Sequence, residues 1–181
     1  NPLTTYAKAN LEAEQGVIPL SDANFVVVVL RQSTVYGYSP RMRFDLAING
    51  MTFGAWSARK LPLMRDGNQW RPLVHVSDTA DAQIFMLTAD KHLVNGEIFN
   101  VGSEENNYRL KDLSDKVAGV VGDDVVQEWY GDPDHRSYRV NFDKIESLGY
   151  KAKFVAEDGV REILERLESG ELDKTDKTIT L

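Results

Sequence analysis

The chain has 181 residues, of which 42% are hydrophobic and 27% are charged, enough for one globular domain with an apolar core. Its formal net charge of -7, without a cluster of Lys and Arg, argues against nucleic acid as a partner. The absence of Cys excludes disulfides and Cys-ligated metal and fits a cytoplasmic location, and the longest apolar run, Phe25 to Leu30, is too short to span a membrane.

Helices and strands alternate in the first third of the chain. Helices are predicted from Leu3 to about Gln15 and from Phe44 to about Trp56. Between them, the continuous apolar run from Phe25 to Leu30 predicts a strand that is buried on both faces. A helix that leads into such a strand is typical of α/β layering, in which ligands bind at the carboxyl ends of the strands. The loop of residues 31–43 follows at that end.

Shorter elements follow from residue 60 onward. Short strands around a hairpin-like turn at residues 66–68 are predicted between Leu61 and Val76. Further helices are expected at about 77–89, 110–121, 142–148 and 157–168, with strands at 98–101 and from 125. The polar residues 169–181 are predicted to form a flexible tail.

A tyrosine and an asparagine share one face of the first predicted helix. Tyr6 and Asn10 are four residues apart, so their side chains lie side by side, whereas Lys8 points away from Tyr6. The helical pattern begins at once, and position 1 is not Met. We therefore expect the chain to be a fragment of a longer protein or a polypeptide that needs a complementary chain.

Five motifs, in this order along the chain, resemble the extended short-chain dehydrogenase/reductase family, which includes NAD-dependent nucleotide-sugar epimerases and dehydratases. They are YAKAN at 6–10, LRQSTVYG at 30–37, DGNQWRPLVHVSD at 66–78, NVG at 100–102 and DHRSYRVNFDKI at 134–145. Each motif alone is weak, but their common order and spacing make the resemblance strong. It implies an α/β fold: the C-terminal part of a Rossmann-type parallel sheet plus a small α/β substrate-binding region.

The resemblance also implies a domain layout and partners. Residues 1–60 would complete the dinucleotide-binding domain, residues 61–168 would form mainly the substrate-binding region, and 169–181 would be the tail. The family's N-terminal Rossmann half carries a Gly-x-x-Gly-x-x-Gly loop, a spacing that does not occur in this sequence. The expected partners are therefore the missing N-terminal half, NAD or NADP, and a nucleotide-diphosphate sugar. A homodimer is also expected, because family members commonly pair through a bundle that includes the tyrosine helix.

In that family a tyrosine acts as acid and base during transient oxidation of a sugar hydroxyl, and a lysine four residues further supplies a positive charge. Tyr6 is the implied acid/base, and Tyr6, Asn10 and Ser33 are the implied cofactor contacts. Asn10 stands at the lysine position without its charge. Such a charge is worth about 4 kcal/mol at 4 Å in an effective dielectric of about 20. Weak hydride-transfer activity is therefore expected unless the positive ring of the cofactor compensates. The alternative is a non-catalytic nucleotide-sugar-binding or assembly module that has lost the lysine.

Candidate ligands of the substrate also come from the resemblance. A guanidinium suits a phosphate because its donors form a planar fork. Arg71 and Arg136 are the implied diphosphate ligands, and Tyr138 lies beside Arg136 in the sequence. Thr34 and Asn49 are implied to reach the same group.

Other polar side chains receive structural interpretations. His75 lies in a predicted strand and is expected to be a packing residue, and Asp78 is expected to cap a helix or lie in its first turn. Asp132, Asp134 and His135 are crowded into one Pro-containing loop. No matching set of ligands stands elsewhere, so no metal site is predicted.

Overall fold

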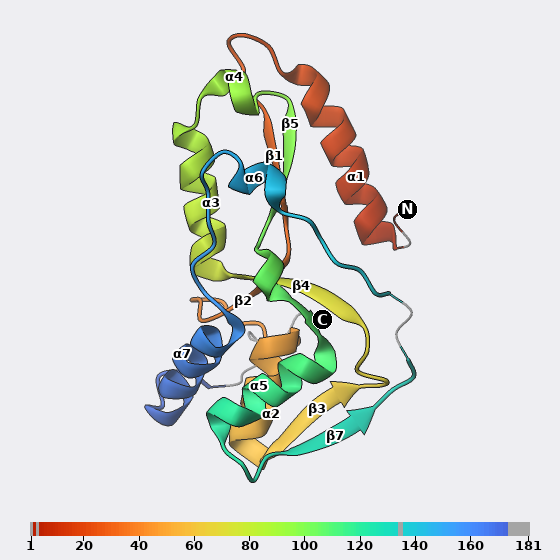
Figure 1. The fold of residues 1–181 in the computed structure, drawn as a ribbon, viewed down its shortest axis with the longest axis vertical. Coiled ribbons are helices and arrows are strands. Elements are labelled where there is room, and N and C mark those ends of the chain that lie inside the picture. Colours follow the sequence, from red (N-terminus) through yellow and green to blue (C-terminus); the bar gives the residue numbers. More distant parts are fainter. Residues whose placement is uncertain (1, 3, 134–135, 174–181) are drawn as a thin grey trace.

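The computed structural model describes residues 2, 4–133 and 136–173. Figure 1 shows an elongated molecule with two parts. The upper lobe contains α1 (Thr5–Val17), β1 (Val28–Gln32), α3 (Val76–Thr88), α4 (Lys91–Val94), β5 (Glu97–Val101) and α6 (Asp143–Glu146). The lower lobe contains α2 (Ala47–Ala58), β3 (Lys60–Met64), α5 (Leu110–Val121), β7 (Val126–Tyr130) and α7 (Ala156–Glu168).

The strands form three small sheets. β1 pairs with β5 and β3 pairs with β7, both in parallel. A third sheet consists of β2 (Thr34–Tyr36), β4 (Trp70–His75) and β6 (Asn107–Arg109), in which β4 is parallel to β2 and antiparallel to β6. β4 runs between the two lobes (Figure 1). The predicted α/β fold with parallel pairing is confirmed.

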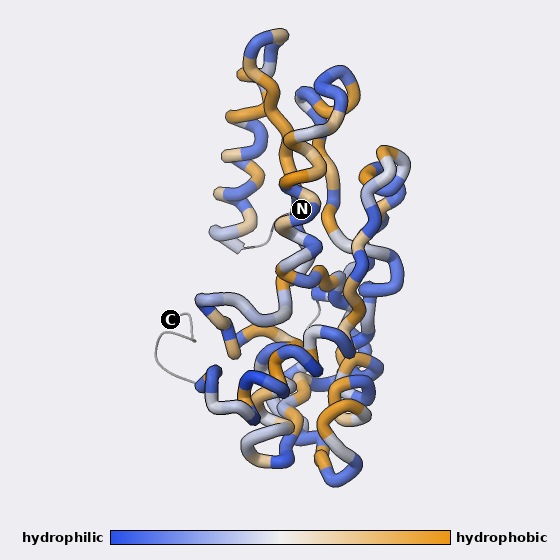
Figure 2. Tube along the Cα trace, turned by 90° about the vertical axis from the view of Figure 1, so that its left-hand side faces the viewer, coloured by the Kyte–Doolittle hydropathy of each residue, from blue (hydrophilic) through white to orange (hydrophobic). Residues whose placement is uncertain are grey.

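Each lobe has its own hydrophobic core, and Figure 2 shows hydrophobic stretches in both. The lower core is built by α2, α5, α7 and β3, for example by Ile48, Leu61, Leu113 and Ile163, which are at most 1% exposed. The upper core is centred on β5, α3 and α6. Both cores take residues from 1–60 and from 61–168, so the domain boundary at residue 60 stays a prediction.

Two expectations about the strands are wrong. The predicted hairpin does not form: the turn at 66–68 is held by the start of α5, whose Lys111 N–H bonds to the oxygen of Gly67 at 2.9 Å, and β3 and β4 enter different sheets. The strand expected at 25–30 begins at Val28 and is only half-buried, with Phe25 54% exposed. Among the described residues β5 is its only strand partner, which leaves its other edge uncovered.

Two segments named above lie wholly or partly outside the described residues. Most of the predicted tail, residues 174–181, lies outside the described residues, while Leu172 packs on the lower core. Positions 134 and 135, considered above for a metal site, lie outside them too. No described helix is long and apolar enough to cross a membrane.

Candidate functional site

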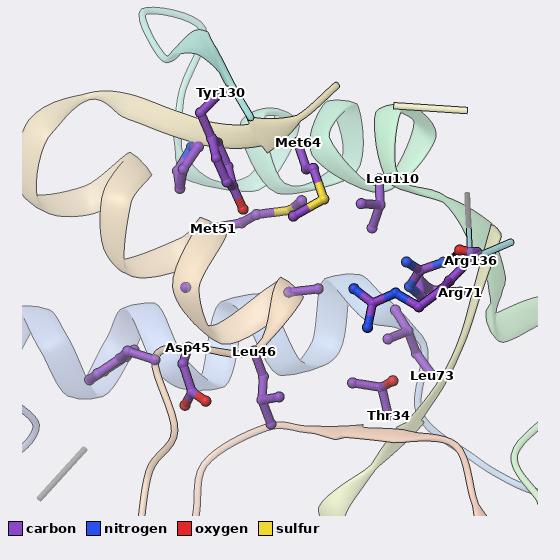
Figure 3. A pocket seen from close by; sticks show the side chains of 14 residues that line it. Thr34, Asp45, Leu46, Met51, Met64, Arg71, Leu73, Leu110, Tyr130 and Arg136 are labelled. Atoms are coloured by element: carbon purple, nitrogen blue, oxygen red, sulfur yellow. Dashed lines mark hydrogen bonds between the residues drawn. The ribbon is translucent and has the colours of Figure 1, made fainter. Parts of the chain in front are cut away.

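A cavity of about 610 Å³ lies in the lower lobe beside β4 (Figure 3). Cavities of this size commonly hold ligands the size of a cofactor or a nucleotide. Its walls come from β2, β3, β4, β7 and the beginnings of α2 and α5, together with residue 136. Three of the side chains predicted to bind the substrate line it, namely Thr34, Arg71 and Arg136.

Two arginines lie at one end of the cavity. Successive strand residues point to opposite faces, so on β4 Arg71 and Leu73 line the cavity while Pro72 lines a depression on the other side. Nη1 of Arg71 donates hydrogen bonds to the backbone oxygens of Trp70, at 2.8 Å, and Arg136. The second bond ties the segment that carries Arg136 to β4. Both guanidinium groups thus lie together (Figure 3), a geometry that can bind a diphosphate.

The beginning of α2 forms a second wall. Leu46 and Ala47 line the cavity, no side chain caps this end of the helix, and its first turn has no acidic residue. Backbone N–H groups and the helix dipole favour an anion at such an end. Gly50 is needed one turn further on, because a Cβ there would lie 2.5 Å from the oxygen of Phe44. The helix therefore adds a favourable environment for negative charge to the two arginines.

The rest of the wall is mainly apolar. Met51 from α2, Met64 from β3 and Tyr130 from β7 point into the cavity (Figure 3), and Pro62 adds to them. Flexible thioethers and an aromatic ring suit a planar ligand ring. The cavity thus has a cationic end and an apolar part, as a nucleotide requires.

Sequence reasoning missed Asp45, Leu46, Met64 and Tyr130, which all line the cavity. Met64 and Tyr130 meet there because β3 and β7 pair with these residues opposite each other. Nothing in the local pattern of either segment indicates that pairing. Asp45 could have been noticed as an acidic residue in the first turn of a predicted helix.

Ser33 and Tyr138 lie outside this cavity. They line the neighbouring depression of about 430 Å³, together with Pro72. Ser33 immediately precedes Thr34, and the alternation of side chains places the two neighbours on different sides. Ser33 and Tyr138 therefore line a different depression from the cavity that Arg71 and Arg136 line.

Asn49, a buried residue of α2, is also absent from the lining, because its side chain bonds to the backbone of the preceding loop. Its Oδ1 accepts the N–H of Gly37 at 3.1 Å, and its Nδ2 donates to the oxygen of Arg43 at 3.2 Å. The side chain thus holds residues 37–43 in place. Asn49 contributes to the cavity by shaping the loop that enters its wall.

A second anchor of this loop starts from His75, which is only 2% exposed, as expected for a packing histidine. Its Nδ1 accepts the N–H of Ser77 at 3.3 Å, so Nε2 carries the proton and donates to Oε2 of Glu162 at 3.1 Å. The same oxygen accepts the N–H of Tyr38 at 3.0 Å. Gly37 has no space for a side chain, since a Cβ would lie 2.4 Å from His75 Nε2. β4, α7 and the loop are therefore locked together.

Asp78 also has a structural role. It lies in the first turn of α3 and is completely buried. Its two carboxylate oxygens accept the N–H groups of Lys153, at 2.9 Å, and Phe154, at 3.1 Å. The first-turn position is as predicted, while the N-cap itself is His75.

Helix α1, which carries Tyr6, is much more exposed than the elements around the cavity. Tyr6 is 78% exposed, Asn10 is exposed, and α1 has no buried residue. Glu14 on this helix forms a bidentate ion pair with Arg31 of β1, at 2.6 and 2.8 Å. The predicted pair of Tyr6 and Asn10 therefore lies on an open face of the molecule.

Arg43 forms an ion pair with the one carboxylate among the described residues that line the cavity. Its guanidinium forms two hydrogen bonds to Asp45, at 2.6 and 3.3 Å, which raise the pKa of Arg43. The charge of Asp45 and the charge of an ionised Tyr6 raise this pKa further. Arg43 therefore holds the carboxylate of Asp45 at the edge of the cavity.

Two tyrosines, Tyr36 and Tyr150, are buried in the hydrophobic cores. Burial, with added repulsion from nearby acidic groups, raises the pKa of Tyr36 and of Tyr150 far above the ordinary value near 10. A proton cannot be removed from them at neutral pH. They are therefore unsuited to acid/base chemistry.

Residues 1–102, more than half of the chain, match the model of the NAD dependent epimerase/dehydratase family. The chain belongs to this family. It is 26% identical over 170 residues to a putative UDP-glucose 4-epimerase of Methanocaldococcus jannaschii, covering 91% of this chain and 53% of that protein. It is 28% identical over 173 residues to dTDP-D-glucose 4,6-dehydratase of Mus musculus, covering 91% and 47%. The chain thus spans about half the length of these curated relatives.

Solved structures of the epimerase/dehydratase type share the fold. The UDP-glucose 4-epimerase of Thermotoga maritima with UDP-glucose has a TM-score of 0.81 at 20% identity, covering 95% of this chain and 56% of that one. The dTDP-glucose 4,6-dehydratase of Bacillus anthracis in complex with NAD has 0.78 at 24%, covering 94% and 54%. The UDP-glucuronic acid 4-epimerase of Bacillus cereus, with UDP-glucuronic acid and NAD, has 0.77 at 22%, covering 93% and 54%.

Proposed function

We propose that the chain is the substrate-binding portion of an NAD(P)-dependent nucleotide-sugar epimerase or dehydratase. The observation that carries this proposal is the convergence of Arg71 and Arg136 with the beginning of α2 on one cavity. These groups would bind the diphosphate. The apolar wall at Met51, Met64 and Tyr130 would receive the nucleobase, and Thr34 would add a hydrogen bond near the arginines.

Tyr6 would exchange a proton with a sugar hydroxyl. Its exposure and that of Asn10 fit the nicotinamide end of a dinucleotide, because a phenol and an amide can both hydrogen-bond to a ribose. Ser33 would contact the same part of the cofactor from the end of β1. When bound, NAD(P) supplies the acceptor and donor of hydride. The exposed face of α1 also supports the proposed homodimer and the proposed contact with an N-terminal Rossmann half.

Titration calorimetry with UDP and dTDP tests the diphosphate site. A hydrogen bond to a charged group contributes about 1.5–3 kcal/mol, so Arg71→Ala and Arg136→Ala should each weaken binding about 10- to 100-fold. Arg161→Ala is the matched control, because Arg161 lies on α7 away from the cavity and pairs with Asp158. Equal affinities in all four proteins would contradict the proposal.

The second candidate is a non-catalytic nucleotide-sugar-binding module, which Asn10 favours. The test is turnover of UDP-glucose and dTDP-glucose with NAD by the intact gene product and by its Asn10→Lys variant. An enzyme should gain at least about tenfold in rate from the restored charge, which corresponds to about 1.4 kcal/mol. Lys8→Asn is the control, since Lys8 does not share the face of Tyr6. Ligand binding without turnover in every variant would support the module.

A further inference from the structure

Arg136 reaches the cavity from a segment without regular structure. Residues 136–140 (the Arg136 segment) form neither helix nor strand, and residues 136–139 are exposed. The chain passes through this segment from β7 in the lower lobe to α6 in the upper lobe (Figure 1). A segment of this kind has many accessible conformations, and ordering each residue costs conformational entropy. The place of Arg136 beside Arg71 therefore depends on contacts of the segment with its neighbours.

The first half of β4 provides one set of contacts. β2 pairs with β4 at residues 73–75, so β6 is the one strand beside Trp70 among the described residues. The N–H of Trp70 donates to Oγ of Ser137 at 3.0 Å. The guanidinium of Arg139 lies 4.8 Å from the centroid of the Trp70 ring, within the range of a cation–π contact. Trp70 thus contacts the segment through both its backbone and its ring.

Asn107 of β6 provides the second set of contacts. Its Oδ1 accepts the N–H of Val140 at 3.0 Å, and its Nδ2 donates to the oxygen of the same residue at 3.0 Å. One side-chain amide thereby satisfies both backbone groups of Val140, as the backbone of a neighbouring strand would do. Asn107 is only 6% exposed, and its Nδ2 also donates to Oε2 of Glu104 at 3.0 Å. The amide that holds Val140 is therefore itself held in place.

We propose that Asn107 and Ser137 are positioning residues for the diphosphate, because they hold the Arg136 segment so that Arg136 stays beside Arg71. Ser137 is the direct neighbour of Arg136, and Asn107 fixes the other end of the segment. Neither residue is among the described residues that line the cavity, so an effect on binding has to pass through the segment. Anchoring the segment in advance lowers the ordering cost of binding. This inference rests on the proposed function and extends it to two side chains outside the cavity.

Titration calorimetry of the chain with UDP tests the role of Asn107. Asn107→Ala removes both bonds to Val140, and UDP should bind about 3- to 10-fold more weakly, because part of the segment must then be ordered on binding. Asn95→Ala is the matched control. Asn95 also joins two segments, since its Oδ1 accepts the N–H of Val27 at 3.0 Å and its Nδ2 donates to the oxygen of Asp22 at 2.9 Å. It lies between α4 and β5 in the upper lobe and does not line the cavity, so its loss should leave the UDP affinity unchanged. Thermal unfolding verifies that both variants are folded.

Ser137 allows a test at an exposed position, where substitution does not disturb a core. Ser137→Ala removes the acceptor of the Trp70 N–H and should weaken UDP binding about 2- to 5-fold. Ser137→Thr keeps the hydroxyl, so it should bind UDP as tightly as the wild type. Equal losses in the two variants would contradict a role of the hydroxyl.

A double-mutant cycle distinguishes positioning from a general loss of stability. If Asn107 acts through Arg136, the variant with both Asn107→Ala and Arg136→Ala should bind UDP as weakly as Arg136→Ala alone, within about twofold. Independent effects would multiply instead. A residue with a merely structural role lowers the unfolding temperature without showing this non-additivity.

The outcomes separate the inference from the proposed function. UDP that binds through Arg71 and Arg136, with an affinity that Asn107→Ala and Ser137→Ala leave unchanged, overturns the inference alone. An equal loss of affinity in Asn95→Ala, or effects of Asn107→Ala and Arg136→Ala that multiply, overturn it as well. If the wild type does not bind UDP, both the proposed function and the inference are wrong.

Discussion

The cavity and the tyrosine helix are held by different forces. The cavity is surrounded by elements of the lower core, in which α2, α5 and α7 bury large apolar side chains such as Ile163. α1 has no buried residue, and among the described residues an ion pair between Glu14 and Arg31 links it to the sheet. Burial thus holds the elements around the cavity together, whereas α1 stays exposed.

The cavity and Tyr6 differ in how firmly the structure holds their side chains, and catalysis depends on such positioning. Reacting groups must be held within a small distance of the substrate, and misplacement by about 1 Å can lower the rate about 100-fold. The described contacts around the cavity meet this need, because hydrogen bonds join Arg71 of β4 to the segment of Arg136 and the loop at Tyr38 to Glu162 of α7. Among the described residues, no hydrogen bond holds the side chain of Tyr6. We therefore expect that binding of the nucleotide needs less additional structure than the chemical step.

The largest expected effect is loss of stability in the lower core. Ile163→Ala removes an apolar side chain that is completely buried, which should reduce the free energy of unfolding by about 2–5 kcal/mol. Val17→Ala at the end of α1 is the matched comparison, because Val17 is 36% exposed and should lose only about 0.5 kcal/mol. Urea unfolding measures both values. Equal losses would show that α1 packs as firmly as the core.

A smaller effect is expected where the loop joins the cavity wall. Gly37 has a φ of 101° and no space for a Cβ beside His75, so Gly37→Ala should cost roughly 2–3 kcal/mol and weaken binding of UDP. Gly119→Ala in α5 is the control, because nothing lies within 4 Å of a Cβ there. That change should stabilise the protein by up to about 1 kcal/mol. Unchanged stability and UDP affinity in Gly37→Ala would contradict the proposed anchoring of the loop.

The sequence was most informative where a structure depends on neighbouring residues. α5 begins at Leu110 and ends at Val121 as predicted, since apolar spacing and the following Gly122 are local signals. The motif order also indicated Arg71 and Arg136, which the structure brings together. Contacts between distant segments could not be predicted from the sequence. A turn such as residues 66–68 indicates that the chain reverses direction, but not which strands then pair.

Contacts between distant segments also form the part of the cavity wall that the sequence analysis did not predict. Met64 and Tyr130 meet across a parallel pair whose strands lie far apart in the sequence. Period-two alternation then decides which of two neighbours enters the cavity, and it separates Ser33 from Thr34. The register that sets this alternation depends on tertiary packing.

The smallest expected effect concerns the link between α1 and the sheet. The hydrogen bond from Arg31 lowers the pKa of Glu14 in the folded protein. A lowered pKa means that this stabilisation is complete above the unfolded value of about 4.3 and disappears as the pH falls through the folded value. Because Arg31 is half-exposed, the effect should be at most about 1 kcal/mol.

Amide hydrogen exchange over residues 5–17, corrected for intrinsic rates, measures this effect at pH 6 and pH 3. In the wild type, protection of α1 should be lower at pH 3. Glu14→Gln should already be less protected at pH 6 and should change less on acidification, while Glu12→Gln should behave like the wild type, since Glu12 has no ion pair among the described residues. The same response in the wild type and both variants would mean that packing, and not the ion pair, holds α1. The cavity and α1 would then differ only in degree, because both regions would depend on apolar contact.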